Sequence, residues 1–210
     1  MIVTGVQGRC VVIDPGFGSQ EELEAVLGCL REKNLQPDAV LITHGHMDHI
    51  GGAAELQKLY GIPVYMSDED WPIIRYFQRA AKFGWYIPDS GFTSTNVSDG
   101  QVIEAAGLKF RVITTPGHTP GGVCYYEESE RALFTGDTLF AGAIGRTDLQ
   151  GGDYDSLIRS IMEKLMSLPG DVTIYSGHGA PSTIGTEMAT NPFLEPFNER
   201  EEIPELNTTE

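Results

Sequence analysis

The sequence predicts an α/β protein in which helices cover the outer faces of two stacked β-sheets, a four-layer αββα sandwich. Short apolar segments typical of buried strands alternate with segments that carry apolar residues at helical spacing, and hairpin patterns occupy the middle of the chain. The 210 residues, 40% of them hydrophobic, suffice for one sizeable core. We expect one domain over residues 1–195, followed by an acidic tail over residues 196–210.

The first elements are a strand, a helix and a second strand. Cys10–Ile13 is a short apolar strand that an Asp-Pro-Gly sequence ends. Ser19 and Glu22 form a capping box, which predicts a helix that starts there and continues with one apolar face as far as Asn34. Ala39–Ile42 is again strand-like.

A helix ending at Tyr60 and a strand over Ile62–Met66 come next, before the least predictable part of the chain, residues 68–98. Aromatic residues are dense there, and they either fill a satellite core or wall a substrate pocket. Arg75 and Lys82 could meet an anionic substrate, although a solvated helix face is the simpler interpretation.

Hairpins and one further helix account for much of the second half. Gln101–Thr114 predicts a hairpin that turns at Ala106-Gly107, and Val123–Tyr126 should pair with Ala132–Thr135. Tyr154–Leu168 has a single apolar face, and the preceding aspartate should cap it.

The most informative pattern is the position of the histidines. All five follow strand-like segments and stand beside glycine or aspartate: His44, His46, His49, His118 and His178. Any one of them alone would be expected to be an ordinary hydrogen-bonded histidine, but none of the five is left over for such a role. In an extended chain His44 and His46 project to the same side, whereas Asp48 and His49 point elsewhere. Asp137 follows a strand and a glycine in the same way, so we expect a metal site shared by two cations.

The series His44-x-His46-x-Asp48-His49, followed by His118, Asp137 and His178, resembles the metallo-β-lactamase-fold hydrolases. It is most similar to their glyoxalase II-type, hydroxyacylglutathione hydrolase-like branch, over about residues 10–195. The resemblance implies the αββα sandwich and a ligand set for two divalent metal ions. Its first metal is held by His44, His46 and His118, its second by Asp48, His49 and His178, and Asp137 bridges the two.

The implied chemistry is hydrolysis without a serine or cysteine nucleophile. Two cations about 3.5–4 Å apart lower the pKa of a bridging water and present hydroxide to a carbonyl. Asp48 is the expected catalytic carboxylate, which orients that hydroxide or carries its proton. Zinc is the first expectation for the metal, with iron and manganese as alternatives, because histidine and aspartate ligands suit all three. Arg146 corresponds to a substrate-binding position of the branch, unless a salt bridge with Asp148 gives both a structural role.

The expected substrate is a small-molecule thioester or ester such as S-lactoylglutathione. Two departures from the family stand out. Relatives usually carry another strand before the one that ends at Asp14, so either residues 1–4 are all that remains of it or the start is truncated. The sequence also ends before the helical glutathione-binding domain of full-length glyoxalase II, so specificity for glutathione thioesters does not follow from the resemblance. Metallo-β-lactamases proper lack the aspartate found here at position 137, which speaks against lactam hydrolysis. The alternative is a persulfide dioxygenase-like enzyme with one iron held by His44, His118 and Asp137, and a third reading is a non-catalytic metal-binding scaffold.

Composition limits the partners. A formal net charge of −16 disfavours nucleic acid and anionic membrane surfaces. No apolar run approaches the roughly 20 residues that a membrane span needs. The three cysteines (Cys10, Cys29 and Cys124) form no paired motif, and no secretion signal opens the chain, so we expect a reducing, cytoplasmic location. The sequence does not specify the oligomeric state.

Overall fold

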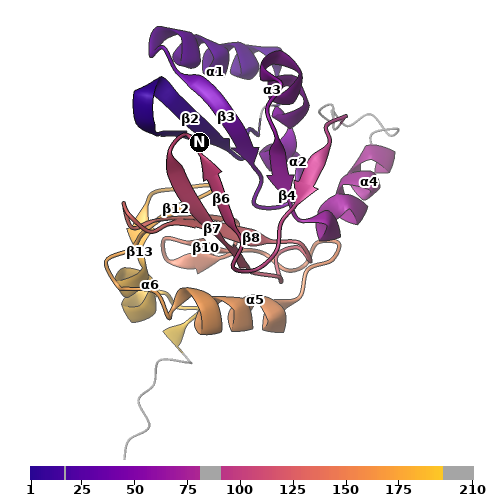
Figure 1. Ribbon diagram of the computed structural model, residues 1–210. Helices are drawn as coiled ribbons and strands as arrows, with labels where there is room; N and C mark the ends of the chain where they lie inside the picture. Colours follow the sequence, from indigo (N-terminus) through magenta and orange to yellow (C-terminus); the bar gives the residue numbers. More distant parts are fainter. Residues whose placement is uncertain (17, 81–90, 196–210) are drawn as a thin grey trace, which may run out of the picture.

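The computed structural model describes residues 1–16, 18–80 and 91–195 of the chain, which form two β-sheets face to face between outer layers of helices (Figure 1). The first sheet has the strand order β1-β2-β3-β4-β5, in which only the pairing of β1 with β2 is antiparallel. Its strands are β1 (Ile2–Thr4), β2 (Arg9–Ile13), β3 (Gln36–Leu41), β4 (Val64–Met66) and β5 (Ser94–Asn96).

The second sheet has the order β13-β12-β9-β8-β7-β6 and is antiparallel except for the pair β9 and β12. Its strands are β6 (Val102–Ala105), β7 (Leu108–Thr114), β8 (Val123–Glu127), β9 (Ala132–Gly136), β12 (Thr173–Ser176) and β13 (Ser182–Thr183). A small hairpin of β10 (Leu139–Phe140) and β11 (Ala143–Ile144) follows β9.

Helices cover the outer face of each sheet. Those of the first half are α1 (Gln20–Glu32), α2 (Met47–Ile50), α3 (Ala53–Tyr60) and α4 (Trp71–Ala80), with the short 3-10 helices η1 (Val6–Gly8) and η2 (Asp68–Asp70). Those of the second half are α5 (Tyr154–Ser160), its π-helical continuation η4 (Ile161–Leu165) and α6 (Ile184–Thr190). None of the helices in the described ranges is long and apolar enough to cross a membrane.

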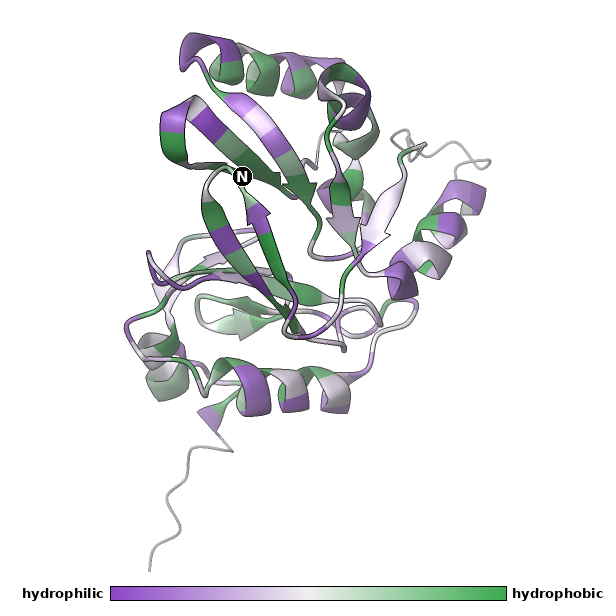
Figure 2. Cartoon of the chain, viewed as in Figure 1, coloured by the Kyte–Doolittle hydropathy of each residue, from purple (hydrophilic) through white to green (hydrophobic). Residues whose placement is uncertain are grey.

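Alternation along the strands builds the layers. In β2, Cys10 and Val12 pack with the helices of the first half, whereas Val11 and Ile13 pack against the other sheet. In β8, Cys124 faces α5 and η4 while Tyr125 lies between the sheets. β2 and β3 accordingly end in hydrophobic residues, and α1 alternates between hydrophobic and hydrophilic residues (Figure 2). The predicted αββα sandwich is confirmed.

Local predictions were mostly confirmed. Ser19 Oγ accepts a hydrogen bond from the backbone N–H of Glu22 at 3.2 Å, and Asp153 caps α5 by accepting from the N–H of Ser156 at 2.7 Å. The predicted turn at Ala106-Gly107 has φ angles of +56° and +76°, which are typical of a tight hairpin turn. Of the residues before the first predicted strand, Ile2–Thr4 form the short strand β1.

Two helix predictions were wrong in their extent. The segment predicted as one helix to Leu168 turns π-helical after Ser160 and ends at Leu165. The sequence does not reveal this change, because one wider turn leaves the spacing of the apolar residues nearly unchanged. The helix after the histidine loop begins at Met47 and is divided at Gly51-Gly52 into α2 and α3.

Some of the aromatic residues between positions 68 and 98 form a satellite core, one of the two roles that the sequence left open for them. The rings of Trp71 and Phe92 lie 5.3 Å apart, and both pack against the core of the first half. Of the other positions named in this region, Arg75 lies exposed on α4, whereas Lys82, Trp85 and the acidic tail lie outside the described residues.

The topology brings the ends of several strands to one edge. β2 and β3 run parallel. β7 and β9 are both antiparallel to β8 and therefore point the same way, and β12 is parallel to β9. The segments that follow β3, β7, β9 and β12 carry all the histidines and Asp137, with His49 in α2 and the others in loops. A hydrogen bond from the N–H of Val123 to the carbonyl of Thr43, 2.9 Å long, joins the two sheets at this edge.

Tyr125 provides a second inter-sheet link that can be tested. Its buried hydroxyl donates to the carbonyl oxygen of Ile42 at 2.8 Å, directly before the histidine loop. We expect Tyr125→Phe to lower the free energy of unfolding, measured by urea denaturation, by about 1–2 kcal/mol, because the buried carbonyl of Ile42 loses a hydrogen-bond donor. Tyr126→Phe is the matched control, since its hydroxyl forms no hydrogen bond with the residues that the structure describes, and it should change stability by less than about 0.5 kcal/mol. Equal losses in both variants would contradict the role of the hydroxyl.

Candidate metal centre

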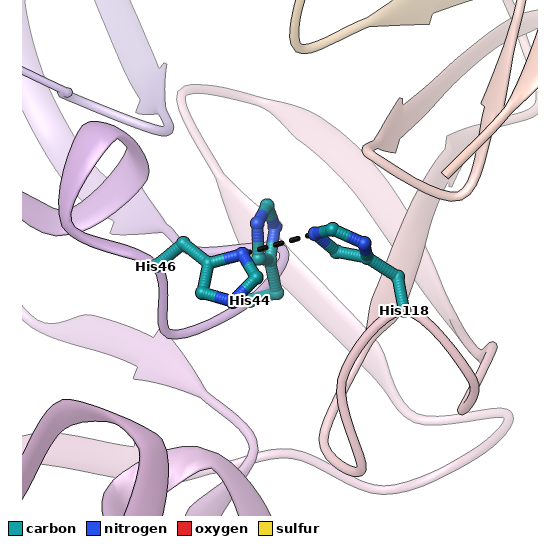
Figure 3. Close-up of side chains that lie close together, drawn as sticks. All are labelled: His44, His46 and His118. Carbon is teal, nitrogen blue, oxygen red and sulfur yellow. Dashed lines mark hydrogen bonds between the residues drawn. The ribbon is translucent and has the colours of Figure 1, made fainter. Parts of the chain in front are cut away.

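Three imidazoles from two loops form the first cluster. His44 and His46 follow β3 and His118 follows β7, and their ring centroids lie 4.7–4.8 Å apart in edge-on pairs (Figure 3). His46 Nδ1 and His118 Nε2 approach to 3.0 Å. All three are buried, so ring nitrogens crowd together where water has little access.

The remaining predicted ligands form a second cluster beside the first. His178 Nε2 lies 3.2 Å from Asp48 Oδ2, and His49 Nε2 lies 3.8 Å from the same oxygen. His49 is buried, whereas the side chains of Asp48 and His178 are 61% and 59% exposed. This second cluster is therefore the more accessible one.

Asp137 lies between the two clusters. Its Oδ1 is 3.3 Å from His49 Nε2 and 3.9 Å from His178 Nε2, and its Oδ2 is 3.9 Å from His118 Nε2. Burial raises the pKa of this carboxyl, but His49 and the other nearby imidazoles outweigh burial and hold the pKa below its usual value. An ionised carboxylate thus presents one oxygen to each cluster.

Protein acceptors hold the outer nitrogens of three imidazoles. Asp14 Oδ2 accepts from His49 Nδ1 at 2.9 Å and from the hydroxyl of Thr43 at 2.7 Å. With its proton given to Asp14, the Thr43 hydroxyl accepts from His44 Nδ1 at 3.0 Å. The Nδ1 of His118 donates to the carbonyl oxygen of Arg146 at 2.7 Å. Because each Nδ1 is the donor, each ring directs its Nε2 into the site.

Several polar atoms that face the site lack partners. His44 Nε2, His49 Nε2 and Asp137 Oδ1 are buried and form no hydrogen bond with the described residues. Burial, then the neighbouring histidines, holds the pKa of His44 well below its usual value, and burial together with His118 lowers the pKa of His46 to about 4. Both rings are therefore neutral near pH 7 and free to act as ligands.

His49 differs because carboxylates surround it. Burial lowers its pKa, but Asp14 and Asp137 outweigh burial and raise the pKa to about 10. A proton on His49 Nε2 and a cation bound there would occupy the same place. Either one would supply the positive charge that the neighbouring carboxylates favour. A buried polar atom without a partner costs about 1–3 kcal/mol, and a set of imidazole and carboxylate donors suits zinc, iron or manganese. The site therefore fits divalent cations. Its possible ligands form three groups, and the ligand atoms of each group lie within 4.8 Å of one another.

Asp70 joins the two histidine loops, a role that the sequence analysis missed. It is fully buried at the end of η2 and accepts from the N–H of Gly45 at 2.7 Å, the hydroxyl of Thr119 at 2.8 Å and the N–H of Gly121 at 2.7 Å. A Cβ on Gly121 would lie only 2.7 Å from Asp70 Oδ1, so the glycine permits this approach. Burial raises the pKa of Asp70, and the three donors oppose that shift.

Arg146 lies at the surface, paired with Asp148. Its Nε donates to Asp148 Oδ1 at 2.7 Å and its Nη2 to Oδ2 at 2.8 Å, a bidentate contact with both side chains exposed. This is the salt bridge that the sequence offered as the structural alternative to substrate binding. The backbone carbonyl of Arg146, not its side chain, contacts the histidine cluster.

Comparison with known proteins identifies the family. The model of the metallo-β-lactamase superfamily matches residues 1–178. The chain belongs to the metallo-β-lactamase superfamily. Within it, the hydroxyacylglutathione hydrolase GloC of Haemophilus influenzae is 38% identical over 193 residues, which cover 89% of this chain and 87% of that protein.

Two solved structures share the fold of this superfamily closely. BLEG-1, described as a B3 metallo-β-lactamase, is 36% identical with a TM-score of 0.82 over 92% of each chain. TTHA1623 in a di-iron-bound form is 36% identical with a TM-score of 0.80, over 92% of this chain and 93% of its own. Membership of this metallo-hydrolase family, together with the histidine and aspartate clusters, supports a metal-dependent hydrolase.

The contacts of Asp14 predict a loss of metal affinity in Asp14→Asn. The amide puts a donor where one carboxylate oxygen accepts from Thr43 or His49, so we expect metal affinity to fall about 10- to 100-fold. A competition titration with a chromophoric chelator measures this. Asp38→Asn, which alters a carboxylate at the other end of β3, should keep the wild-type affinity; an unchanged affinity in Asp14→Asn would contradict the orienting role.

Asp70→Asn should loosen both histidine loops at once. The amide nitrogen would face an N–H or hydroxyl donor, which leaves a buried donor unsatisfied and costs about 1–3 kcal/mol of unfolding free energy. Hydrogen exchange by mass spectrometry should show faster exchange in peptides that contain His46 and His118. Thr119→Val removes only one of the three contacts and should show a smaller effect, so equal effects would argue against the joint role of Asp70.

Proposed function

We propose that this chain is a dinuclear metal-dependent hydrolase of acyl thioesters, of the hydroxyacylglutathione hydrolase kind. The observation that carries the proposal is the position of Asp137, whose two oxygens face separate groups of imidazoles. Similarity to GloC over most of both chains supports the thioester class.

The proposed ligands divide as the clusters do. His44, His46 and His118 would hold one cation, Asp48, His49 and His178 a second, and Asp137 would contact both. When bound, the cations would supply Lewis acidity and lower the pKa of water in the site. Zinc is our first expectation, and the di-iron form of TTHA1623 supports iron as an alternative.

The protein's own contribution is to fix the ligands and move a proton. Asp14, Thr43 and the carbonyl of Arg146 keep the donor nitrogens in one tautomer. Asp48 is the proposed proton carrier, because its carboxylate is both at the cluster and open to solvent. Protonating the departing thiolate would complete hydrolysis.

Lactam hydrolysis is the second candidate. Asp137 speaks against it, but the 36% identity with BLEG-1, described as a B3 metallo-β-lactamase, favours testing it. The persulfide dioxygenase-like alternative needs one iron and oxygen, whereas here Asp48, His49 and His178 form a further cluster of possible ligands. Oxygen uptake with a persulfide distinguishes it from hydrolysis.

We expect the purified protein to contain about two metal ions per chain by plasma mass spectrometry and to release thiol from an acyl thioester of glutathione. Asp137→Ala should lower thiol release at least about 100-fold and reduce the metal content, because it removes an oxygen from each cluster. Asp171→Ala, at an exposed carboxylate paired with Arg131, is the matched control. Full activity in Asp137→Ala, or turnover of a lactam or persulfide in place of thioesters, would overturn the proposal.

A further inference from the structure

A cavity of about 500 Å³ lies between α4 and the loops on the His118 side of the molecule. Glu69, Arg75, Tyr76 and Arg79 line it from η2 and α4, and Pro120 and Gly151 line it from the opposite loops. Its volume is within the range of about 300–1,000 Å³ that is typical of small-molecule sites.

The cavity carries an unusual local charge for so acidic a chain. Arg75 and Arg79 stand one helical turn apart, where like charges repel each other, and neither forms an ion pair with the residues that the structure describes. Among the described residues of the lining, Glu69 contributes the one carboxylate. An anion between the two guanidinium groups would remove the repulsion, and the planar guanidinium matches a carboxylate in particular.

The same elements border the proposed metal site. On α4, the ring of Phe77 contacts His46 at 5.7 Å and Tyr76 at 5.5 Å, so adjacent residues face the histidine cluster and the cavity. On the other side, Pro120 is two residues beyond His118. Gly151 packs against Pro120 so closely that an added Cβ would lie 2.9 Å from its Cδ. Phe77 and Pro120 therefore lie where the cavity borders the first imidazole cluster.

We propose that Arg75 and Arg79 form a subsite for a carboxylate on the thiol portion of the substrate, which makes the preferred substrates acidic thioesters. This inference rests on the proposed thioesterase function. The scissile thioester lies at the imidazole clusters, and the thiol portion extends past Phe77 and Pro120 into the cavity. The exposed ring of Tyr76 gives the extended portion an apolar surface beside the charges.

The test compares substrates that differ in charge. The metal-loaded protein is assayed with an acyl thioester of glutathione, which has two carboxylates, and with the same acyl thioester of N-acetylcysteamine, which is neutral. Arg75→Gln and Arg79→Gln should each raise KM for the glutathione thioester about three- to ten-fold, with kcat and the neutral substrate unchanged. Glu69→Gln should shift KM the opposite way, and Arg159→Gln, on α5 in the other outer layer, should leave both substrates unaffected.

Binding of S-methylglutathione, a thioether that cannot be hydrolysed, gives a readout independent of turnover. Calorimetry should show its affinity falling in the two arginine variants and with added salt. Hydrolysis of both thioesters without any charge dependence would overturn the subsite and leave the thioesterase function intact. Hydrolysis of neither would overturn both proposals.

Discussion

The site depends on one carboxylate at the end of β2. Asp14 accepts hydrogen bonds from the backbone and hydroxyl of Thr43 and from the ring of His49, and through Thr43 it also fixes His44. To do so its backbone adopts a φ of +47°, a left-handed conformation that aspartate tolerates better than most residues. The lone pairs of both rings face inward as a result, an arrangement that is costly unless a proton or cation lies between them.

The fold supplies the rest of the geometry. Parallel strands deliver their carboxyl ends to a common edge, so ligands distant in sequence meet without any long loop of their own. Asp70 then ties the loop after β3 to the loop after β7 across the gap between the sheets. The buried Glu187 of α6 makes a comparable tie, accepting from the N–H of Gly142 at the β10–β11 turn, in the segment that connects Asp137 to Arg146.

The sequence predicted features whose causes are local. The capping box at Ser19, the hairpin turn at Ala106-Gly107 and the alternation in β2 and β8 each depend on residues within a few positions of one another. The predicted ligands also came together, because glycine- and histidine-rich strand ends share one edge. Their roles as ligands stay a prediction.

The supporting residues were missed for a different reason. Asp14 looked only like a strand terminator, and nothing near Asp70 in the sequence marks its role, since the partners of the two residues lie 25 to 51 residues away. Only the paired sheets reveal such contacts. The orientation of α4 also depends on tertiary packing, because its residues Ile73 and Ile74 are buried. This orientation places Arg75 and Arg79 at the cavity.

The hairpin turn at Ala106-Gly107 has a mechanical consequence. Ala106 donates to Asp38 Oδ2 at 2.8 Å and accepts from the N–H of Val6 at 2.9 Å, so it clamps the sheets at the end opposite Tyr125 and Val123. Two sheets pinned at both ends cannot slide over each other. Shear of one sheet over the other would break these hydrogen bonds, so the strand ends that carry the histidines keep their spacing.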